Sequence, residues 1–158
     1  MVRGPGVNRN GIRSAAWRKS SVKLFIDTWG WLVLEDSKDP QHQAASRIYA
    51  ETAKAAGNIL TTNFVLDETF SRLFSRRPFE EASRFAKGLL ESPFIGIEEI
   101  TRARFQRAFE LRLTFRDKPD ISFTDLTSMA IVQELKIVDI LTGDRHFIQA
   151  GLGFRTHP

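Results

Sequence analysis

The chain has 158 residues, the usual length of one domain, and 42% apolar with 27% charged residues is the balance of a globular protein, which argues against a two-domain enzyme. It contains no cysteine, which excludes disulfide bonds, thiolate zinc sites, iron–sulfur clusters and thiol chemistry. The net charge of +4 arises in residues 1–22, which hold basic side chains and no acid, so the remainder is nearly neutral. The pI of about 9.8 is therefore weak evidence for a nucleic-acid-binding surface on the folded part.

We expect residues 1–22 to form a basic, disordered leader and residues 23–158 to form the folded domain. The leader is rich in arginine and free of acids, so an organelle transit peptide is the alternative interpretation. It has no apolar core of the kind that a secretory signal needs. No stretch approaches the roughly 20 continuous apolar residues of a membrane span, and we expect a cytoplasmic protein.

Short apolar runs alternate with helical patterns along the rest of the chain. The first run, 24–26, ends at Asp27 and is typical of a strand buried on both faces. In chain order the patterns predict strands at 24–26, 59–61, 94–97 and 137–141, helices at 41–56, 64–76, 78–90, 98–115 and 123–135, a short helix after Asp144 and an apolar turn at 152–154. Four strands separated by helices predict an α/β fold, a three-layer α/β/α sandwich with a central, mainly parallel sheet.

Acidic residues gather where the predicted strands end. Because the carboxyl ends of parallel strands meet at one edge of a sheet, we expect these carboxylates to lie close together. Carboxylates without cationic partners repel one another, and a bound divalent cation relieves that cost. Oxygen ligands favour Mg²⁺ or Mn²⁺, which activate water for attack on phosphodiesters. The acids concerned are Asp27, Asp67, Glu68, Asp120, Asp125 and Asp144.

Three of these acids also have a purely structural interpretation. Asp27 is in position to open a turn, and Asp144 is in position to cap the short helix that follows it. Ser122 and Asp125 have the S-x-x-D spacing of a capping box, in which Asp125 bonds back to the start of its own helix. Both interpretations of each residue stay open at the level of sequence.

The predicted helix 64–76 carries two adjacent acids that compete for a place in the site. Its main apolar stripe includes Leu66 and Phe70, and Glu68 lies nearly opposite that stripe. Periodicity alone therefore predicts an exposed Glu68, and Asp67 is the alternative if the helix is rotated.

The sequence lacks the motifs of nucleotide-cofactor enzymes, of HExxH zinc enzymes and of aspartate-nucleophile phosphatases. There is no GxGxxG or GxxxxGK[ST] loop, which removes the main support for a nucleotide cofactor, and no histidine has HExxH spacing. We interpret His42 and His146 as residues at helix starts. An aspartate-nucleophile phosphatase needs a second Asp two residues after Asp27, where Trp29 stands.

Four segments in order resemble the PIN domain, in particular the VapC-like toxins of bacterial and archaeal toxin–antitoxin pairs. They are KLFIDT (23–28), TTNFVLDETFSRL (61–73), ISFTDLTSMAI (121–131) and ILTGDRHF (140–147). The resemblance extends over residues 23–154 and implies a PIN-like fold and an endoribonuclease that depends on Mg²⁺ or Mn²⁺. It also implies a homodimer and a small cognate antitoxin. A non-catalytic module that binds RNA or protein through the same fold is the alternative function.

The resemblance also implies roles for particular residues. It favours Glu68 over Asp67, and it places Thr28 at an adjacent hydroxyl position, with Asp120 as a further supporting residue. The residues to which it assigns catalysis and metal binding are Asp27, Glu68, Asp125 and Asp144.

An RNA substrate calls for cationic contacts to its phosphates. The candidates in the sequence are Arg76, Arg77 and Arg145. The predicted helix 98–115 carries apolar side chains that serve either the core or a dimer interface, and the sequence does not distinguish the two. These side chains are Phe105, Phe109, Leu113 and Phe115.

Overall fold

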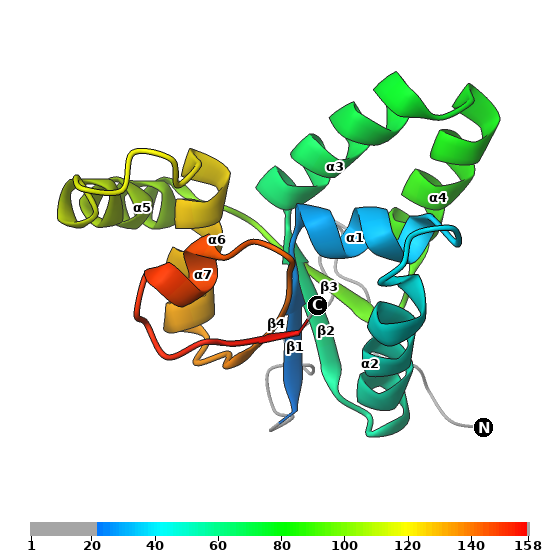
Figure 1. Cartoon of the computed structure of the whole chain (residues 1–158), viewed down its shortest axis with the longest axis horizontal. Coiled ribbons are helices and arrows are strands. Elements are labelled where there is room, and N and C mark those ends of the chain that lie inside the picture. The colour runs from blue at the N-terminus through cyan, green and yellow to red at the C-terminus, as the bar shows by residue number, and fades with distance from the viewer. Residues whose placement is uncertain (1–21, 158) are drawn as a thin grey trace, which may run out of the picture.

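The structure is a computed structural model, and it describes residues 22–157. The predicted leader, except for its last residue, lies outside this range. Five parallel strands form one sheet in the order β3-β2-β1-β4-β5 (Figure 1). Their bounds are β1 Lys23–Ile26, β2 Asn58–Thr62, β3 Ile95–Glu98, β4 Asp139–Leu141 and β5 Arg155–His157.

The order of the strands determines where a site can form. β1 lies in the middle of the sheet, and its Leu24 is aligned with Ile59 of β2 on one side and with Asp139 of β4 on the other. The chain builds β2 and β3 on one side of β1 and then returns to build β4 and β5 on the other. The carboxyl ends of β1 and β4 therefore border the crevice in which open α/β sheets bind ligands.

Helices cover both faces of the sheet, which confirms the predicted three-layer sandwich. In Figure 1, α1, α2 and α4 lie to one side of the strands and α6 and α7 to the other, while α3 rises beyond the carboxyl end of β2 and α5 lies outside α6. Their bounds are α1 Thr28–Glu35, α2 His42–Lys54, α3 Asn63–Arg76, α4 Phe79–Glu91, α5 Arg102–Thr114, α6 Phe123–Glu134 and α7 His146–Gln149.

The core explains why the short apolar runs become strands. β2 is buried along its whole length, and the side chains of Phe25, Ile26 and Ile140 have at most 1% exposure. Strands flanked by helices on both faces need apolar side chains in both directions, which is why these runs are continuous rather than alternating.

Helix α1 was not predicted, and it is the element that closes over the edge of the sheet. It starts directly after β1 because the Asp27 side chain accepts a hydrogen bond from the backbone N–H of Gly30 at 2.8 Å, which caps the helix. Gly30 is required for close packing, since a Cβ atom there would lie 2.6 Å from the backbone oxygen of Leu141 in β4. The cap and the contact with β4 place α1 against the carboxyl end of the sheet.

Two further differences concern element bounds. Glu98, predicted to start a helix, instead ends β3, and α5 begins at Arg102 behind its N-cap Thr101. The predicted terminal turn is followed by a fifth strand, β5, which pairs with β4. Two side chains of β5 bind the Asp139 carboxylate: the Arg155 guanidinium donates a hydrogen bond to it, and His157 Nε2 lies 2.8 Å from Asp139 Oδ1.

The apolar side chains of α5 divide between the core and the surface. Phe115, just after the helix, is 8% exposed and belongs to the core, whereas Phe105, Phe109 and Leu113 are 46%, 52% and 60% exposed. The latter three form an uncovered stripe at four-residue spacing, meaning that each side chain stays about half exposed in the described structure, although the Phe105 ring also contacts the rings of Phe64 and Phe123. Among residues 22–157, no helix is both long enough and apolar enough to cross a bilayer.

Candidate active site

Asp27 lies at the carboxyl end of β1 and is 5% exposed. One of its oxygens, Oδ1, accepts the backbone N–H of Gly30, and the other, Oδ2, accepts the hydroxyl of Thr142 from the loop after β4. Burial raises the pKa of Asp27 from its ordinary 3.8 to about 7, against the effect of these hydrogen bonds, and the charges of Asp125 and Asp144 add to the rise. The carboxyl group is thus fixed in place and costly to ionise without a nearby positive charge.

Asp125 stands at the start of α6, and the structure shows that its capping role leaves an oxygen free. The capping box with Ser122 is formed, but both bonds from Ser122 go to Oδ2, at 3.2 Å from the backbone nitrogen and 2.6 Å from the hydroxyl. Burial raises the pKa of Asp125, and the charges of Asp144 and Glu68 raise it further, while the bonds from Ser122 lower it. The structural and functional interpretations of Asp125 are therefore compatible.

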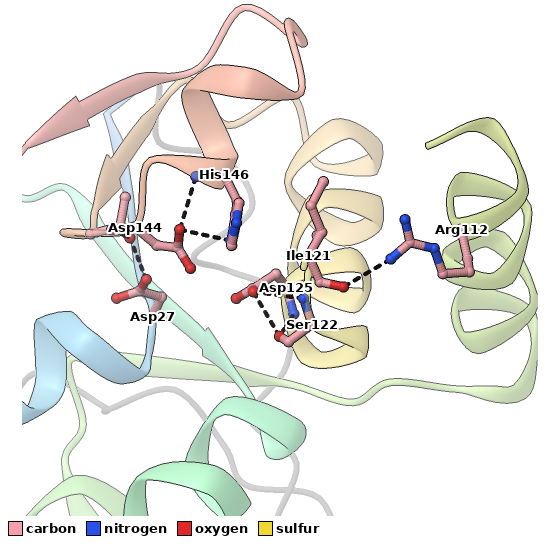
Figure 2. Close-up of polar contacts among 8 residues, drawn as sticks. Asp27, Arg112, Ile121, Ser122, Asp125, Asp144 and His146 are labelled. Carbon is pink, nitrogen blue, oxygen red and sulfur yellow. Dashed lines mark hydrogen bonds and ion pairs between the residues drawn. The ribbon is translucent and has the colours of Figure 1, made fainter. Parts of the chain in front are cut away.

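The loop that leads to Asp125 is held by a single arginine. The guanidinium of Arg112 donates hydrogen bonds to the backbone oxygens of Ile121 at 2.9 Å, Lys118 at 2.7 Å and Phe115. Figure 2 shows Arg112 reaching from α5 to Ile121, next to Ser122 and Asp125. A positively charged group that satisfies three carbonyls of one turn fixes the position at which α6 begins.

Asp144 is held by the loop after β4. The Thr142 hydroxyl accepts the backbone N–H of Asp144 at 2.9 Å while it donates to Asp27, so Thr142 links the two acids. Asp144 Oδ1 accepts the backbone N–H of His146 at 2.8 Å, at the start of α7. Gly143 is needed between them, because a Cβ atom there would lie 2.4 Å from the indole ring of Trp29.

Glu68 faces the site and Asp67 does not. Glu68 Oε2 accepts the hydroxyl of the buried Thr28 at 2.9 Å, and its Oε1 is 2.5 Å from Arg72 on the next turn of α3. Asp67 is exposed. The periodicity argument that placed Glu68 on the open face of the helix is wrong, because α1 packs beside α3 and covers that side, as in Figure 1.

The structure brings together most, but not all, of the acids that the sequence singled out. Asp125 and Asp144 each offer a carboxylate oxygen, and His146 offers a ring nitrogen, within 4.8 Å of one another. Asp27 adjoins this group through Thr142, and Glu68 is close enough to affect the pKa of Asp125. Asp120 is exposed in the preceding turn and lies outside the group, so its supporting role stays a prediction.

The candidate RNA contacts lie at different distances from this group. Arg145 is exposed and stands between Asp144 and His146 in the chain. Arg76 is exposed at the last position of α3, about 12 Å along the helix from Glu68 at about 1.5 Å per residue. Arg77 is bound to the end of α1 by ion pairs at 3.0 Å and 2.8 Å; its partners are Glu35 and Asp36. Of the three, Arg145 is placed best to meet a substrate at the acids.

The donor set fits a divalent cation. In residues 22–157, no lysine or arginine forms an ion pair with Asp27, Asp125 or Asp144, although burial raises the pKa of the first two. Asp125 Oδ1 is left over by the capping box and is available as a ligand. A dication bound here would offset the repulsion that the protein itself leaves uncompensated.

His146 is the member of the group that sequence reasoning missed. Its position at a helix start was predicted, but that position also directs its side chain back to the loop and the two acids. The signal available in the sequence was its place two residues after Asp144, within ILTGDRHF.

Comparison with known proteins agrees with this fold. The PIN domain family model matches residues 24–152, and the chain therefore belongs to the PIN domain family, a family of nucleases. A solved neighbour confirms the VapC-like character. It is VapC20 of Mycobacterium tuberculosis, described as a sarcin–ricin loop cleaving toxin, and it is 30% identical with a TM-score of 0.71, over 81% of this chain and 95% of that one.

A second neighbour supports the fold alone. VapBC2 of Rickettsia felis, solved with a DNA fragment from its promoter, is 14% identical with a TM-score of 0.69, over 87% of this chain and 100% of that one. No curated protein sequence matches the chain significantly.

Proposed function

We propose that the protein is an endoribonuclease that requires Mg²⁺ or Mn²⁺ and that it acts as the toxin of a toxin–antitoxin pair. The observation that carries the proposal is the convergence of Asp27, Asp125 and Asp144 at the carboxyl edge of β1 and β4, with mutual repulsion and no lysine or arginine in the described residues to offset it. Helix capping needs no negative charge, so a cluster of carboxylates that costs stability is typical of a site built for a ligand.

The residues of the chain have distinct roles in this proposal. Asp125, Asp144 and Asp27 hold the ion, and Glu68 supports the site through Thr28. When bound, the ion supplies a water of lowered pKa and stabilises the charge that develops on the phosphate. The Thr142 hydroxyl orients the Asp27 carboxylate by donating to it and holds the backbone of Asp144 by accepting its N–H. Water attacks the phosphate in line without a covalent enzyme intermediate.

Substrate recognition falls to groups around the acids. Arg145 is exposed beside Asp144 and is our proposed contact to an RNA phosphate, and Arg76 extends the same role along α3. The similarity to VapC20, described as a sarcin–ricin loop cleaving toxin, makes an RNA with the sarcin–ricin loop the first substrate to test. Structured loops of this kind present unstacked bases that a protein can read.

The test is metal-dependent cleavage of RNA by the full chain. We expect cleavage with Mg²⁺ or Mn²⁺ and none with a chelator, and a loss of roughly 100-fold or more in Asp27→Asn and in Asp125→Asn. Asp67→Asn is the matched control, since this exposed acid lies next to Glu68 and should be dispensable. Full cleavage by Asp27→Asn would reject the site, and metal binding without cleavage of any RNA would favour a non-catalytic binding module.

We also propose that the chain forms a homodimer and binds a small antitoxin. The uncovered stripe of Phe105, Phe109 and Leu113 on α5 supplies apolar surface for one of these contacts. Light scattering of the purified chain tests whether it forms a homodimer. Rescue of bacterial growth by the product of a short reading frame directly upstream tests for the antitoxin. Growth arrest without such rescue would indicate a nuclease that is not a paired toxin.

A further inference from the structure

The side chain of His146 is placed as a ligand would be. It is the first residue of α7, and Figure 2 shows its ring between the carboxylates of Asp144 and Asp125, with all three side chains directed to the same space. Its ring nitrogen and one oxygen from each acid lie within 4.8 Å of one another. The three groups come from two separate segments of the chain, and the loop and helix caps described above hold them there.

Among the described residues, the ring nitrogen Nδ1 of His146 lies close to a carboxylate but forms no hydrogen bond. Nδ1 of His146 is buried, and within residues 22–157 no group forms a hydrogen bond with it. Asp144 Oδ1 lies 2.9 Å away but is not aligned with the nitrogen, and this oxygen already accepts the backbone N–H of the same histidine. A buried polar atom without a hydrogen bond carries a cost in free energy, which a ligand removes.

The spacing suits coordination better than hydrogen bonding. Two adjacent ligands of an octahedral ion, each about 2.1 Å from the metal, lie about 3 Å apart, and opposite ligands lie about 4 Å apart. The separation of 2.9 Å between Nδ1 and Asp144 Oδ1 and the outer limit of 4.8 Å for the group are close to these values. The spacing of the three groups is thus compatible with their binding one ion.

We propose that His146 Nδ1 binds the divalent ion directly, together with Asp125 and Asp144, and that this mixed set favours Mn²⁺ over Mg²⁺. The proposal rests on the metal dependence proposed above and adds a ligand and a selectivity to it. Imidazole is a good ligand for transition metals, whereas Mg²⁺ prefers oxygen and keeps its waters. A nitrogen ligand therefore adds more to the affinity for Mn²⁺ than for Mg²⁺.

The first experiment uses the full wild-type chain loaded with Mn²⁺ alone at substoichiometric concentration. Pulsed electron paramagnetic resonance detects the coupling between Mn²⁺ and a coordinated imidazole nitrogen, which is absent when all ligands are oxygen. We expect this coupling at the tightest site. Calorimetry with Mn²⁺, and with Mg²⁺ in competition, gives the affinity for each ion.

The variants separate coordination from positioning. His146→Asn keeps an amide donor near the position of Nδ1 but removes the imidazole, so we expect loss of the nitrogen coupling and a weakening of Mn²⁺ binding by about 10-fold or more, with a smaller effect on Mg²⁺. His42→Asn is the matched control, because His42 Nδ1 lies 2.9 Å from the backbone oxygen of Val33, outside the site. It should leave the coupling and both affinities unchanged.

The outcomes distinguish this proposal from the proposed function. Mn²⁺ bound at one site without nitrogen coupling, or with equal losses for both ions in His146→Asn, would overturn the role of His146 while leaving metal-dependent RNA cleavage intact. Coupling that disappears only in His146→Asn supports the proposal even if no RNA is cleaved, in which case the proposed function fails. Absence of any Mn²⁺ binding together with absence of cleavage would reject both.

Discussion

The buried carboxyl group of Asp27 should make the metal-free protein less stable as the pH rises. Burial raises its pKa from 3.8 to about 7 in the folded state, while the unfolded chain has the ordinary value. Between about pH 4 and pH 7 the folded protein keeps a proton that the unfolded chain has released. The stability associated with that proton is fully present below pH 4 and is lost as the pH rises to about 7.

The size of this effect follows from the same pKa. A change from 3.8 to about 7, at about 1.4 kcal/mol per pH unit, corresponds to about 4 kcal/mol of unfolding free energy above pH 7. Asp27→Asn removes the ionisation but keeps an oxygen for the N–H of Gly30 and a polar group for Thr142. The variant should therefore gain about 4 kcal/mol relative to wild type between pH 4 and pH 8.

Urea unfolding followed by circular dichroism, with a chelator present and at several pH values, measures this difference. Asp120→Asn is the control, because its exposed side chain lies outside the acidic group, and its effect should not vary over the same range. A constant difference between Asp27→Asn and wild type from pH 4 to pH 8 would show that Asp27 is not desolvated, and the interpretation of the site as an uncompensated anionic cluster would be wrong.

Three further predictions use the same unfolding and cleavage assays. Asp139→Asn should show the opposite pH dependence, because Arg155, and to a lesser extent His157, lower the pKa of Asp139. At pH 7 the variant should be less stable than wild type by up to about 1 kcal/mol. The difference should disappear once the pH falls below the lowered pKa. Gly30→Ala should lower the free energy of unfolding by about 2 kcal/mol, since its Cβ would press on the backbone of β4. Gly88→Ala, on the open face of α4, should raise the free energy of unfolding by up to about 1 kcal/mol. Changes of the same sign in both variants would contradict the close contact at Gly30. Gly143→Ala should displace the indole of Trp29, seen as a fluorescence shift, and reduce RNA cleavage, and adding Trp29→Ala should restore part of that cleavage; no shift would exclude the contact.

The sequence predicts the strands near the site because their burial is local. Leu24 to Ile26 and the run in β2 are continuous apolar segments, and the sheet that they imply is present. α1 was missed because it is apolar on several sides and has no clear helical period, and its start depends on the Asp27 side chain rather than on a pattern. β5 was missed because Arg155–His157 contains no apolar residue and forms only by pairing with β4.

The residues of the site also differ in whether local sequence or tertiary packing determines their position. Asp27, Asp125 and Asp144 were placed by chain order and by the rule for parallel sheets, and the structure brings all three to one edge. Glu68 was placed by the resemblance and not by periodicity, since the contact with Thr28 depends on how α1 packs against α3. His146 was interpreted as a helix start, because no pattern in the sequence shows which way a ring at that position faces.

Two acids of this site, Asp27 and Asp125, also take part in helix capping, so capping and metal binding are not competing interpretations of these residues. Asp27 is the N-cap of α1, and Asp125 completes the capping box behind Ser122, the N-cap of α6. The N-terminal ends of two helices therefore lie at the acidic group, and their partial positive charge offsets part of the repulsion. Asn is as good a cap as Asp, but it carries no charge. Asp27→Asn therefore removes the anion and keeps the cap of α1, whereas Asp27→Ala removes both. Comparing the two variants separates the chemistry of the site from the stability of the fold.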